Sequence, residues 1–399
     1  MKTAVIYDKW LHQFGGAEVV AVTMAEILLK CGWKVTFISG QNVNPSKIKE
    51  KLSIDLEKVE FHTVWNDEDR LKRIVEDKDL FINLSFMDYG YAYAKKNIYY
   101  THFPTPIRNF LFNATLAFFK ATGLHALLPT NLRQRISDRT RAGIFFDMSK
   151  RLSSYDVILA NSKYTKKWIK NYWNMDSQVL YPPINIVDSR LRGNDNQNHG
   201  KDLKLSSSGL TRGSRNNWIT SIGRFFTLGH GKKQEILIDA FKKLTSLADI
   251  DWQLHLIGGL GGEASSIKFM KQLKTMAKGY PIYFHINVNH NEVGNVLSQS
   301  KIYWHATGFG ENEDKNPMAF EHFGIAPVEA IGAGCIPLLY NGGGLPEIIE
   351  KVGLQKEKYL FNTIGDLVEK TLAISPDTIK PINFFSVTQF ATDFKRYIL

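Results

Sequence analysis

The chain has 399 residues, of which 44% are hydrophobic and 22% are charged, a composition typical of a folded globular protein and not of a disordered one. This length exceeds what one ordinary hydrophobic core supports, so we expect two domains. No run reaches the ~18 apolar residues that span a bilayer, and an early charge breaks the N-terminal apolar stretch, so we expect a cytoplasmic protein that is not exported.

The net charge of +11 is unevenly distributed along the sequence. The first 187 residues carry +8, residues 188–217 carry +3, and the remainder is neutral. Such an excess is typical of a nucleic-acid-binding protein or of a protein that lies on an anionic membrane surface. The two cysteines, Cys31 and Cys335, lie in apolar stretches, and we expect reduced core residues that bind no metal.

The first domain is predicted over residues 1–187. A buried strand at Thr3–Tyr7 precedes a turn with Gly15 and Gly16, a helix over Val19–Lys30 and a strand at Trp33–Ser39. This order predicts a parallel, doubly wound α/β sheet. Further strands are expected at Leu80–Leu84, Asn97–Thr101 and Val157–Asn161.

Residues 104–151 of this domain are basic and aromatic. Eight cations are opposed only by Asp138 and Asp147. The segment suits an amphipathic helix on an anionic membrane surface, but core packing with a solvated basic face explains it equally well. The cations are Arg108, Lys120, Arg133, Arg135, Arg139, Arg141, Lys150 and Arg151, interleaved with Phe110, Phe112, Phe118, Phe119, Phe145 and Phe146.

Residues 188–217 are polar and rich in Ser, Asn and Gly, which predicts a flexible connector without chemistry of its own. A second domain follows over residues 218–384, and residues 385–399 form a last helix. The second domain repeats the alternation of strands and helices. Its strands are predicted at Trp218–Ile222, Trp252–Ile257, Ile282–Val288, Ile302–His305 and Ile336–Tyr340, and its helices at Gln234–Leu244, Glu292–Leu297 and Pro327–Ile331.

Three cations follow the first strand of this second domain. Arg224 comes directly after the strand, and Lys232 and Lys233 precede the next helix. Two adjacent lysines at such a position are commonly solvated and bind no ligand. However, lysine at a helix N-terminus opposes the helix dipole, so a bound anion is the better explanation. A departing nucleoside diphosphate is an anion that preorganised cations stabilise.

Two carboxylates, Glu321 and Glu329, bracket a predicted helix start. Pro327 suits the first helical turn, which places Glu321 in the preceding loop and Glu329 within that turn. The free N–H groups between them can bind a diphosphate, while the carboxylates accept from sugar and ribose hydroxyls. The alternative is that Glu329 merely complements the helix dipole.

The sequence resembles the retaining GT-B glycosyltransferases of the family 4 type, also called glycosyl transferases group 1. The characteristic motif of this family is a pair of glutamates separated by seven residues, and Glu321 and Glu329 match it. Residues 332–337 and 342–347 look like its small-residue turn and second glycine-rich loop. The stretch from Trp304 through Pro317 is similar to the lipid-linked mannosyltransferase subset.

The resemblance implies two Rossmann-like doubly wound domains that face each other across a cleft, with the last helix crossing back to the first domain. It implies that Arg224 and Lys232 hold the donor diphosphate, although Lys233 remains an alternative to Lys232. It also implies a sugar contact for His102, with His322 as a second candidate. The remaining implied donor contacts are Gly15 and Gly16, Glu321 with the N–H groups of Phe323, Gly324 and Ile325, and Glu329 on the ribose.

The resulting hypothesis is a retaining hexosyltransferase that needs no cofactor and no metal ion. Its donor is GDP-mannose or a UDP-sugar, and its acceptor is a glycan or a lipid-linked molecule, as in cell-envelope polysaccharide biosynthesis. It is expected on the inner face of the membrane, contacting it through residues 104–151. The alternatives are a GT-B sugar-nucleotide epimerase and a non-enzymatic nucleic-acid-binding protein, but no nucleic-acid-binding motif is found.

Overall fold

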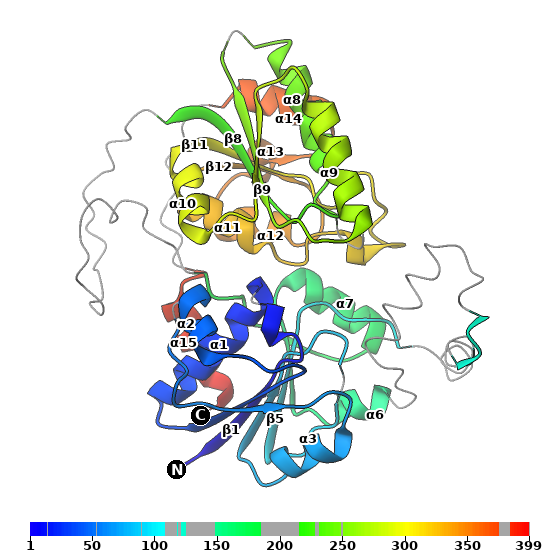
Figure 1. The fold of residues 1–399 in the computed structure, drawn as a ribbon, viewed down its shortest axis with the longest axis vertical. Helices are drawn as coiled ribbons and strands as arrows, with labels where there is room; N and C mark the ends of the chain where they lie inside the picture. The colour runs from blue at the N-terminus through cyan, green and yellow to red at the C-terminus, as the bar shows by residue number, and fades with distance from the viewer. Residues whose placement is uncertain are drawn as a thin grey trace. The chain divides into compact units, whose positions relative to one another are not determined.

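The computed structural model describes residues 1–13, 15–52, 54–88, 90–107, 118, 121–124, 148–184, 215–227, 231–248, 250–374 and 384–398. The chain forms two compact units (Figure 1). Unit 1 comprises Met1–Pro183 and Val387–Leu399, and unit 2 comprises Ile184–Ser386. No helix among the described residues is both long and apolar enough to cross a bilayer.

Unit 1 contains a seven-stranded sheet in the order β3-β2-β1-β4-β5-β6-β7, and neighbouring strands are parallel. Parallel neighbours require crossover connections, and helices supply them. The strands are β1 (Thr3–Tyr7), β2 (Lys34–Ser39), β3 (Glu60–Thr63), β4 (Leu80–Asn83), β5 (Lys96–Thr101), β6 (Val157–Ala160) and β7 (Gln178–Val179). The helices are α1 (Gly16–Lys30), α2 (Pro45–Leu52), α3 (Glu68–Val75), α6 (Met148–Ser153), α7 (Lys163–Trp173) and α15 (Val387–Ile398), and a 3-10 turn lies at Leu11–Gln13.

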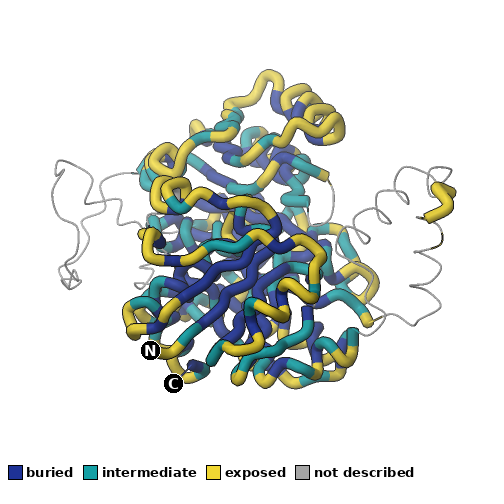
Figure 2. Tube along the Cα trace, turned by 60° about the horizontal axis from the view of Figure 1, so that its bottom comes forward, coloured by how far each residue is buried: buried dark blue, intermediate teal, exposed yellow. Residues whose placement is uncertain are grey.

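The core of unit 1 explains why the last helix belongs to it. Phe390, Phe394 and Ile398 of α15 are buried in the same apolar cluster as residues of α1 and β1. Buried stretches run along the strands while most loops are exposed (Figure 2). The prediction for Cys31 was wrong: this residue ends α1 and is exposed, whereas Cys335 is buried as expected.

Unit 2 contains a six-stranded parallel sheet in the order β10-β9-β8-β11-β12-β13. Helices α8, α9 and α14 pack against one face, where their apolar residues join those of the strands (Figure 1). The strands are β8 (Asn216–Ile222), β9 (Gln253–Gly258), β10 (Ile282–Ile286), β11 (Ser300–His305), β12 (Ile336–Tyr340) and β13 (Leu360–Phe361). The helices are α8 (Gln234–Thr245), α9 (Ala264–Ala277), α10 (His290–Gln299), α11 (Ile325–Gly332), α12 (Leu345–Lys351), α13 (Lys356–Tyr359) and α14 (Ile364–Leu372), with a 3-10 turn at Pro317–Ala319.

Arg215 stabilises the beginning of this sheet. Its guanidinium donates to the carbonyl oxygens of Ser300 at 2.7 Å, Leu297 at 3.2 Å and Ala333 at 2.6 Å. These carbonyls lie at the ends of α10 and α11, where helical oxygens lack partners within their own helix. Most of the predicted connector lies outside the described residues, but its last residues, 215–217, are structural, because β8 begins at Asn216.

Candidate functional site

Two predicted site residues that are 89 positions apart in the sequence form a salt bridge in unit 2. Lys232 Nζ lies 2.6 Å from Glu321 Oε2, and both side chains are nearly buried, at 14% and 13% exposure. Lys232 lies in the connection from β8 to α8, and Glu321 lies in the connection from β11 to α11. Both connections leave the carboxyl ends of their strands, which is the edge where open α/β sheets bind ligands.

A buried histidine, which the sequence reasoning did not single out, supports Glu321. His305 ends β11, and its Nε2 lies 2.8 Å from Glu321 Oε2 and 2.8 Å from the Thr307 hydroxyl. The hydroxyl of Tyr303 lies 3.3 Å from His305 Nδ1, and burial lowers the pKa of His305. A neutral ring with its proton on Nε2 can donate to Glu321, and Nδ1 can then accept from Tyr303. The available signal was a histidine in an otherwise apolar strand that ends before the Glu321 loop.

The second glycine-rich loop packs against the backbone that carries Glu321. The N–H of Gly344 donates to the carbonyl oxygen of Glu321 at 2.7 Å. A Cβ at Gly344 would overlap the carbonyl oxygen of His322, and Gly343 has a φ of +63°, which favours glycine. These glycines hold the Glu321 loop in place by close backbone approach.

Helix α11 begins earlier than predicted. Gly324 is its N-cap, with a φ of +108°, and Ile325 is its first residue. Pro327 is therefore the third helical residue, where its missing N–H still needs no partner. Consequently Glu329 lies beyond the first turn, and the prediction of a first-turn carboxylate was wrong. Phe323 is buried and its ring packs edge-on against Phe385, with centroids 5.3 Å apart.

Glu329 lies on α11 between buried neighbours and is itself only partly exposed. Within the described residues, no side chain or backbone group forms a hydrogen bond with its carboxylate. Burial raises its pKa to about 7 from a reference of 4.5. A carboxylate of this kind gains from a ligand that brings hydroxyl donors.

The three predicted cations differ in their surroundings. Arg224 is exposed, its guanidinium lies 4.9 Å from the centre of the Phe226 ring, and it forms no ion pair with any described residue. Lys233 has left-handed backbone geometry with a φ of +55°, and its ammonium lies 2.7 Å from Glu311. Lys232 alone of the two lysines is directed at Glu321.

Close backbone packing positions Arg224 and Lys232. A Cβ at Gly258, which ends β9, would overlap the carbonyl oxygen of Gly223. A Cβ at Gly223 would overlap the Lys232 side chain near its base. Gln234 at the start of α8 donates to the carbonyl oxygens of both Gly223 and Arg224.

Unit 1 carries the other three predicted residues. Gly15 is the N-cap of α1 and Gly16 its first residue. A Cβ at Gly15 would lie 2.8 Å from Glu18 Oε2, so a neighbouring side chain limits the space there.

His102 follows β5 and is partly buried. Its carbonyl oxygen accepts from Asn161 and Thr165, and its ring packs edge-on against Tyr100. Burial lowers its pKa to about 4, so the ring is neutral near pH 7.

Two further predictions concern metal ions and the membrane segment. Among the described residues, no three His, Cys, Asp or Glu side chains come together as metal ligands. Of the basic segment 104–151, only 104–107, 118, 121–124 and 148–151 are described, so the predicted membrane helix lies outside the described residues.

Comparison with known families finds a match in the second half of the chain. Residues 209–370 match the profile of Glycosyl transferases group 1. The chain is 24% identical over 321 residues to GDP-Man:Man(3)GlcNAc(2)-PP-Dol alpha-1,2-mannosyltransferase from Dictyostelium discoideum, covering 75% of this chain and 58% of that protein. It is 30% identical over 225 residues to the enzyme of the same name from Xenopus tropicalis, covering 55% of this chain and 40% of that protein.

Solved structures show the fold of the whole chain. A glycosyltransferase from Rickettsia africae ESF-5 matches with a TM-score of 0.65 at 14% identity, covering 99% of this chain and 97% of that one. Anabaena Alr3699/HepE in complex with UDP and glucose matches with a TM-score of 0.60 at 15% identity, covering 100% and 99%. These matches confirm the predicted α/β fold class, the GT-B fold with two Rossmann-like domains.

Proposed function

We propose that this chain, whose residues 209–370 belong to glycosyl transferases group 1, transfers a hexose from a nucleotide-sugar to a glycan or lipid-linked acceptor with retention of anomeric configuration. GDP-mannose is the preferred donor, because the names of the Dictyostelium and Xenopus relatives include GDP-Man. The same names include a PP-Dol acceptor, which supports a lipid-linked acceptor here. The names of the Dictyostelium and Xenopus relatives and of the Rickettsia structure describe transferases, which disfavours an epimerase.

The salt bridge between Lys232 and Glu321 is the observation that carries this proposal. A sugar phosphate presents hydroxyl donors next to phosphate acceptors. A cation and an anion held 2.6 Å apart match that alternation, because Lys232 binds the phosphate and Glu321 accepts from the sugar hydroxyls. When the donor binds, the ion pair between Lys232 and Glu321 is therefore replaced by a contact from Lys232 to the phosphate and a contact from Glu321 to the sugar.

The other residues complete the donor site. Arg224, which has no ion-pair partner among the described residues, binds the diphosphate through its planar guanidinium. The N–H groups at the start of α11, at Gly324 and Ile325, add positive potential. Glu329 accepts from the ribose diol.

The chemistry follows from this charge distribution. As the bond from the anomeric carbon to the diphosphate breaks, the leaving oxygen gains negative charge, and Lys232 and Arg224 stabilise it. The acceptor hydroxyl attacks on the same face and gives its proton to the leaving phosphate oxygen, which yields retention. His102 contacts the donor sugar, and Gly15 and Gly16 let the backbone approach the donor closely. No divalent cation or cofactor is required in this scheme.

Isothermal titration with GDP-mannose and with UDP-glucose, with and without a chelator, tests the proposal. Lys232→Ala should weaken donor binding by at least about tenfold, the effect of losing one charge-assisted hydrogen bond. Lys233→Ala is the matched control and should retain binding, because its ammonium contacts Glu311. The opposite ranking of the two variants would refute the assignment.

Turnover should persist with chelator present, and the product linkage read by NMR should keep the donor's anomeric configuration. Conversion of the sugar nucleotide in the absence of any acceptor would instead identify an epimerase. The remaining proposals are a cytoplasmic location and contact with the inner membrane face through residues 104–151, with no nucleic-acid partner.

A further inference from the structure

Helix α9 carries a surface that the proposed donor site does not use. Lys268, Lys271 and Lys274 recur at intervals of three residues, so they share one side of the helix; Lys278 is the C-cap of α9, and all four lysines are exposed. We call these four lysines the α9 basic face. The opposite side of α9 is buried in the core of unit 2 through Phe269, Met270 and Leu273.

The charge of this face is not compensated. The sequence contains no Asp or Glu from position 264 through position 291. None of the four lysines forms an ion pair with a described residue. Elsewhere in unit 2, exposed lysines do pair, as Lys356 does with Glu350 at 3.1 Å. An ordinary solvated helix face carries both signs of charge, and this one carries only positive charge.

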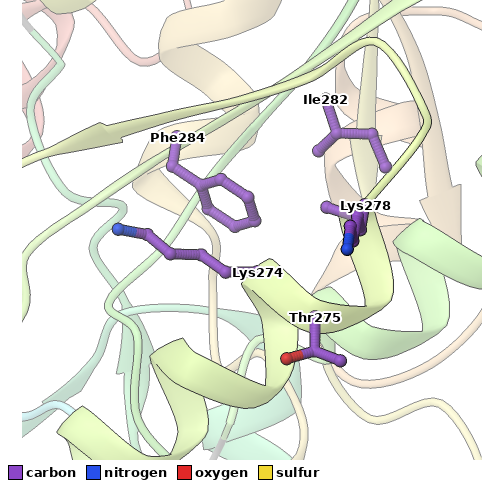
Figure 3. Close-up of a pocket in the computed structure, with 6 residues that line it drawn as sticks. Lys274, Thr275, Lys278, Ile282 and Phe284 are labelled. Atoms are coloured by element: carbon purple, nitrogen blue, oxygen red, sulfur yellow. The ribbon is translucent and has the colours of Figure 1, made fainter.

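Apolar groups accompany the lysines. Ile267 lies on the same side of α9 and is 42% exposed. At the C-terminal end of the face, Lys274 and Lys278 border a cavity of about 490 Å³ whose lining includes Ile282 and Phe284 of β10. Figure 3 shows Ile282 and Phe284 on one side of this cavity and the two lysines with Thr275 on the α9 side.

The cavity lies at the edge of the sheet, where the helices that cover its face end. Strand β10 is at one edge of the sheet, and Ile282 and Phe284 are only partly buried against the core. Tyr280, in the connection from α9 to β10, is exposed as well. Tyr280 lies under Lys242 of α8, whose ammonium is 5.4 Å from the ring centre. Aliphatic and cationic groups are therefore mixed on one surface.

The C-terminal end of this surface, with Lys278 and the cavity, is remote from the donor site within unit 2. In a parallel sheet flanked by helices, the helix C-termini return to the edge where strands begin. Lys278 caps the C-terminus of α9 and Ile282 begins β10, whereas Lys232 and Glu321 follow the ends of their strands. Changes on the α9 basic face should therefore leave donor binding intact.

We infer that the α9 basic face and the cavity beside it bind the surface of an anionic phospholipid bilayer. The lysines contact lipid phosphates, and the neighbouring aliphatic side chains insert among the upper parts of the acyl chains. Exposed Ile267 beside the lysines favours a bilayer over a nucleic acid, because an aliphatic side chain inserts among acyl chains but does not stack with bases. This inference is independent of the proposed enzymatic activity.

Co-sedimentation of the full chain with vesicles tests the inference. Vesicles of phosphatidylcholine alone are compared with vesicles containing about one third phosphatidylglycerol, at about 0.1 M and about 1 M salt. The protein should bind only the anionic vesicles, and high salt should release it. Replacing Lys268, Lys271, Lys274 and Lys278 together by Gln should lower the partition coefficient by at least about tenfold, since each lysine near an anionic surface contributes.

Helix α7 provides a matched control in unit 1. Lys163, Lys166, Lys167 and Lys170 are exposed with similar spacing, and their replacement by Gln removes the same charge. That variant should still bind anionic vesicles nearly as wild type does. Unchanged thermal midpoints would show that both variants are folded.

Two results would overturn the inference. One is equal loss of binding in both variants, which would indicate a response to net charge alone. The other is unchanged vesicle binding by the α9 variant. Replacement of Ile267 by Asn tests the apolar part separately, and it should weaken binding to anionic vesicles at about 0.1 M salt without changing the net charge.

Discussion

The partly buried carboxylate of Glu329 makes a prediction about both stability and binding. Its pKa is raised from 4.5 to about 7 by burial. In the unfolded chain the group ionises near 4.5, so folding is opposed by ionisation above that pH. The stability that the neutral acid provides is fully present below about pH 4.5 and is lost as the pH rises through about 7.

The difference between the folded and unfolded pKa of Glu329 lowers the unfolding free energy by about 3 kcal/mol near pH 8 and by about 1 kcal/mol near pH 5. Because Glu329 is partly exposed, these values are upper bounds. Glu329→Gln removes the ionisation and should raise the unfolding free energy of unit 2 near pH 8 by up to about 3 kcal/mol, with a smaller gain near pH 5. Urea unfolding followed at both pH values measures this.

Donor binding should change in the opposite direction. Ribose hydroxyls that donate to Glu329 require the ionised carboxylate, so the affinity for GDP-mannose should fall as the pH drops below about 7, by up to about tenfold per pH unit. The phosphates of the sugar nucleotide are both esterified and do not titrate in this range. Glu329→Gln should bind the donor weakly and with little pH dependence.

A control substitution separates this effect from a general loss of charge. Glu357→Gln removes an exposed carboxylate on α13 and should change neither the stability profile nor donor affinity. The reasoning is refuted if Glu329→Gln is no more stable near pH 8 than near pH 5 relative to wild type. It is equally refuted if donor affinity in the wild type is flat from about pH 5.5 to about pH 8.

Two further variants test how the site is held. His305→Phe removes the hydrogen bond to Glu321, and kcat/KM should fall by about tenfold or more. His305→Gln keeps an N–H donor and should recover part of this loss. Equal losses in both variants would show that the shape of the ring matters and not its hydrogen bond. Gly223→Ala should displace Lys232, which packs directly on this glycine, and should weaken donor binding about tenfold by calorimetry. Gly262→Ala, whose added Cβ meets no atom within 4 Å, is the control and should bind like wild type.

Much of the fold could be predicted from local sequence. Apolar runs bounded by glycine turns located most of the longer strands, and Thr3–Tyr7 and Ile336–Tyr340 have the predicted bounds. The short edge strands β7 and β13 were not predicted, since two residues carry no measurable periodicity. Helix α1 starts at Gly16, three residues before the predicted Val19, because Gly15 and not an apolar residue marks its N-terminus.

The sequence alone identified the chemical types present at the site: two carboxylates, Glu321 and Glu329, and Arg224 with two lysines after a strand. Only the tertiary structure separated Lys232 from Lys233, because adjacent residues at a helix start point in different directions and meet different carboxylates. Long-range packing likewise brought His305 to Glu321 and Arg215 to the ends of α10 and α11. Periodicity and spacing describe which face of one element a residue occupies, but contacts between elements depend on how sheets and helices pack, and that packing is decided by the whole chain.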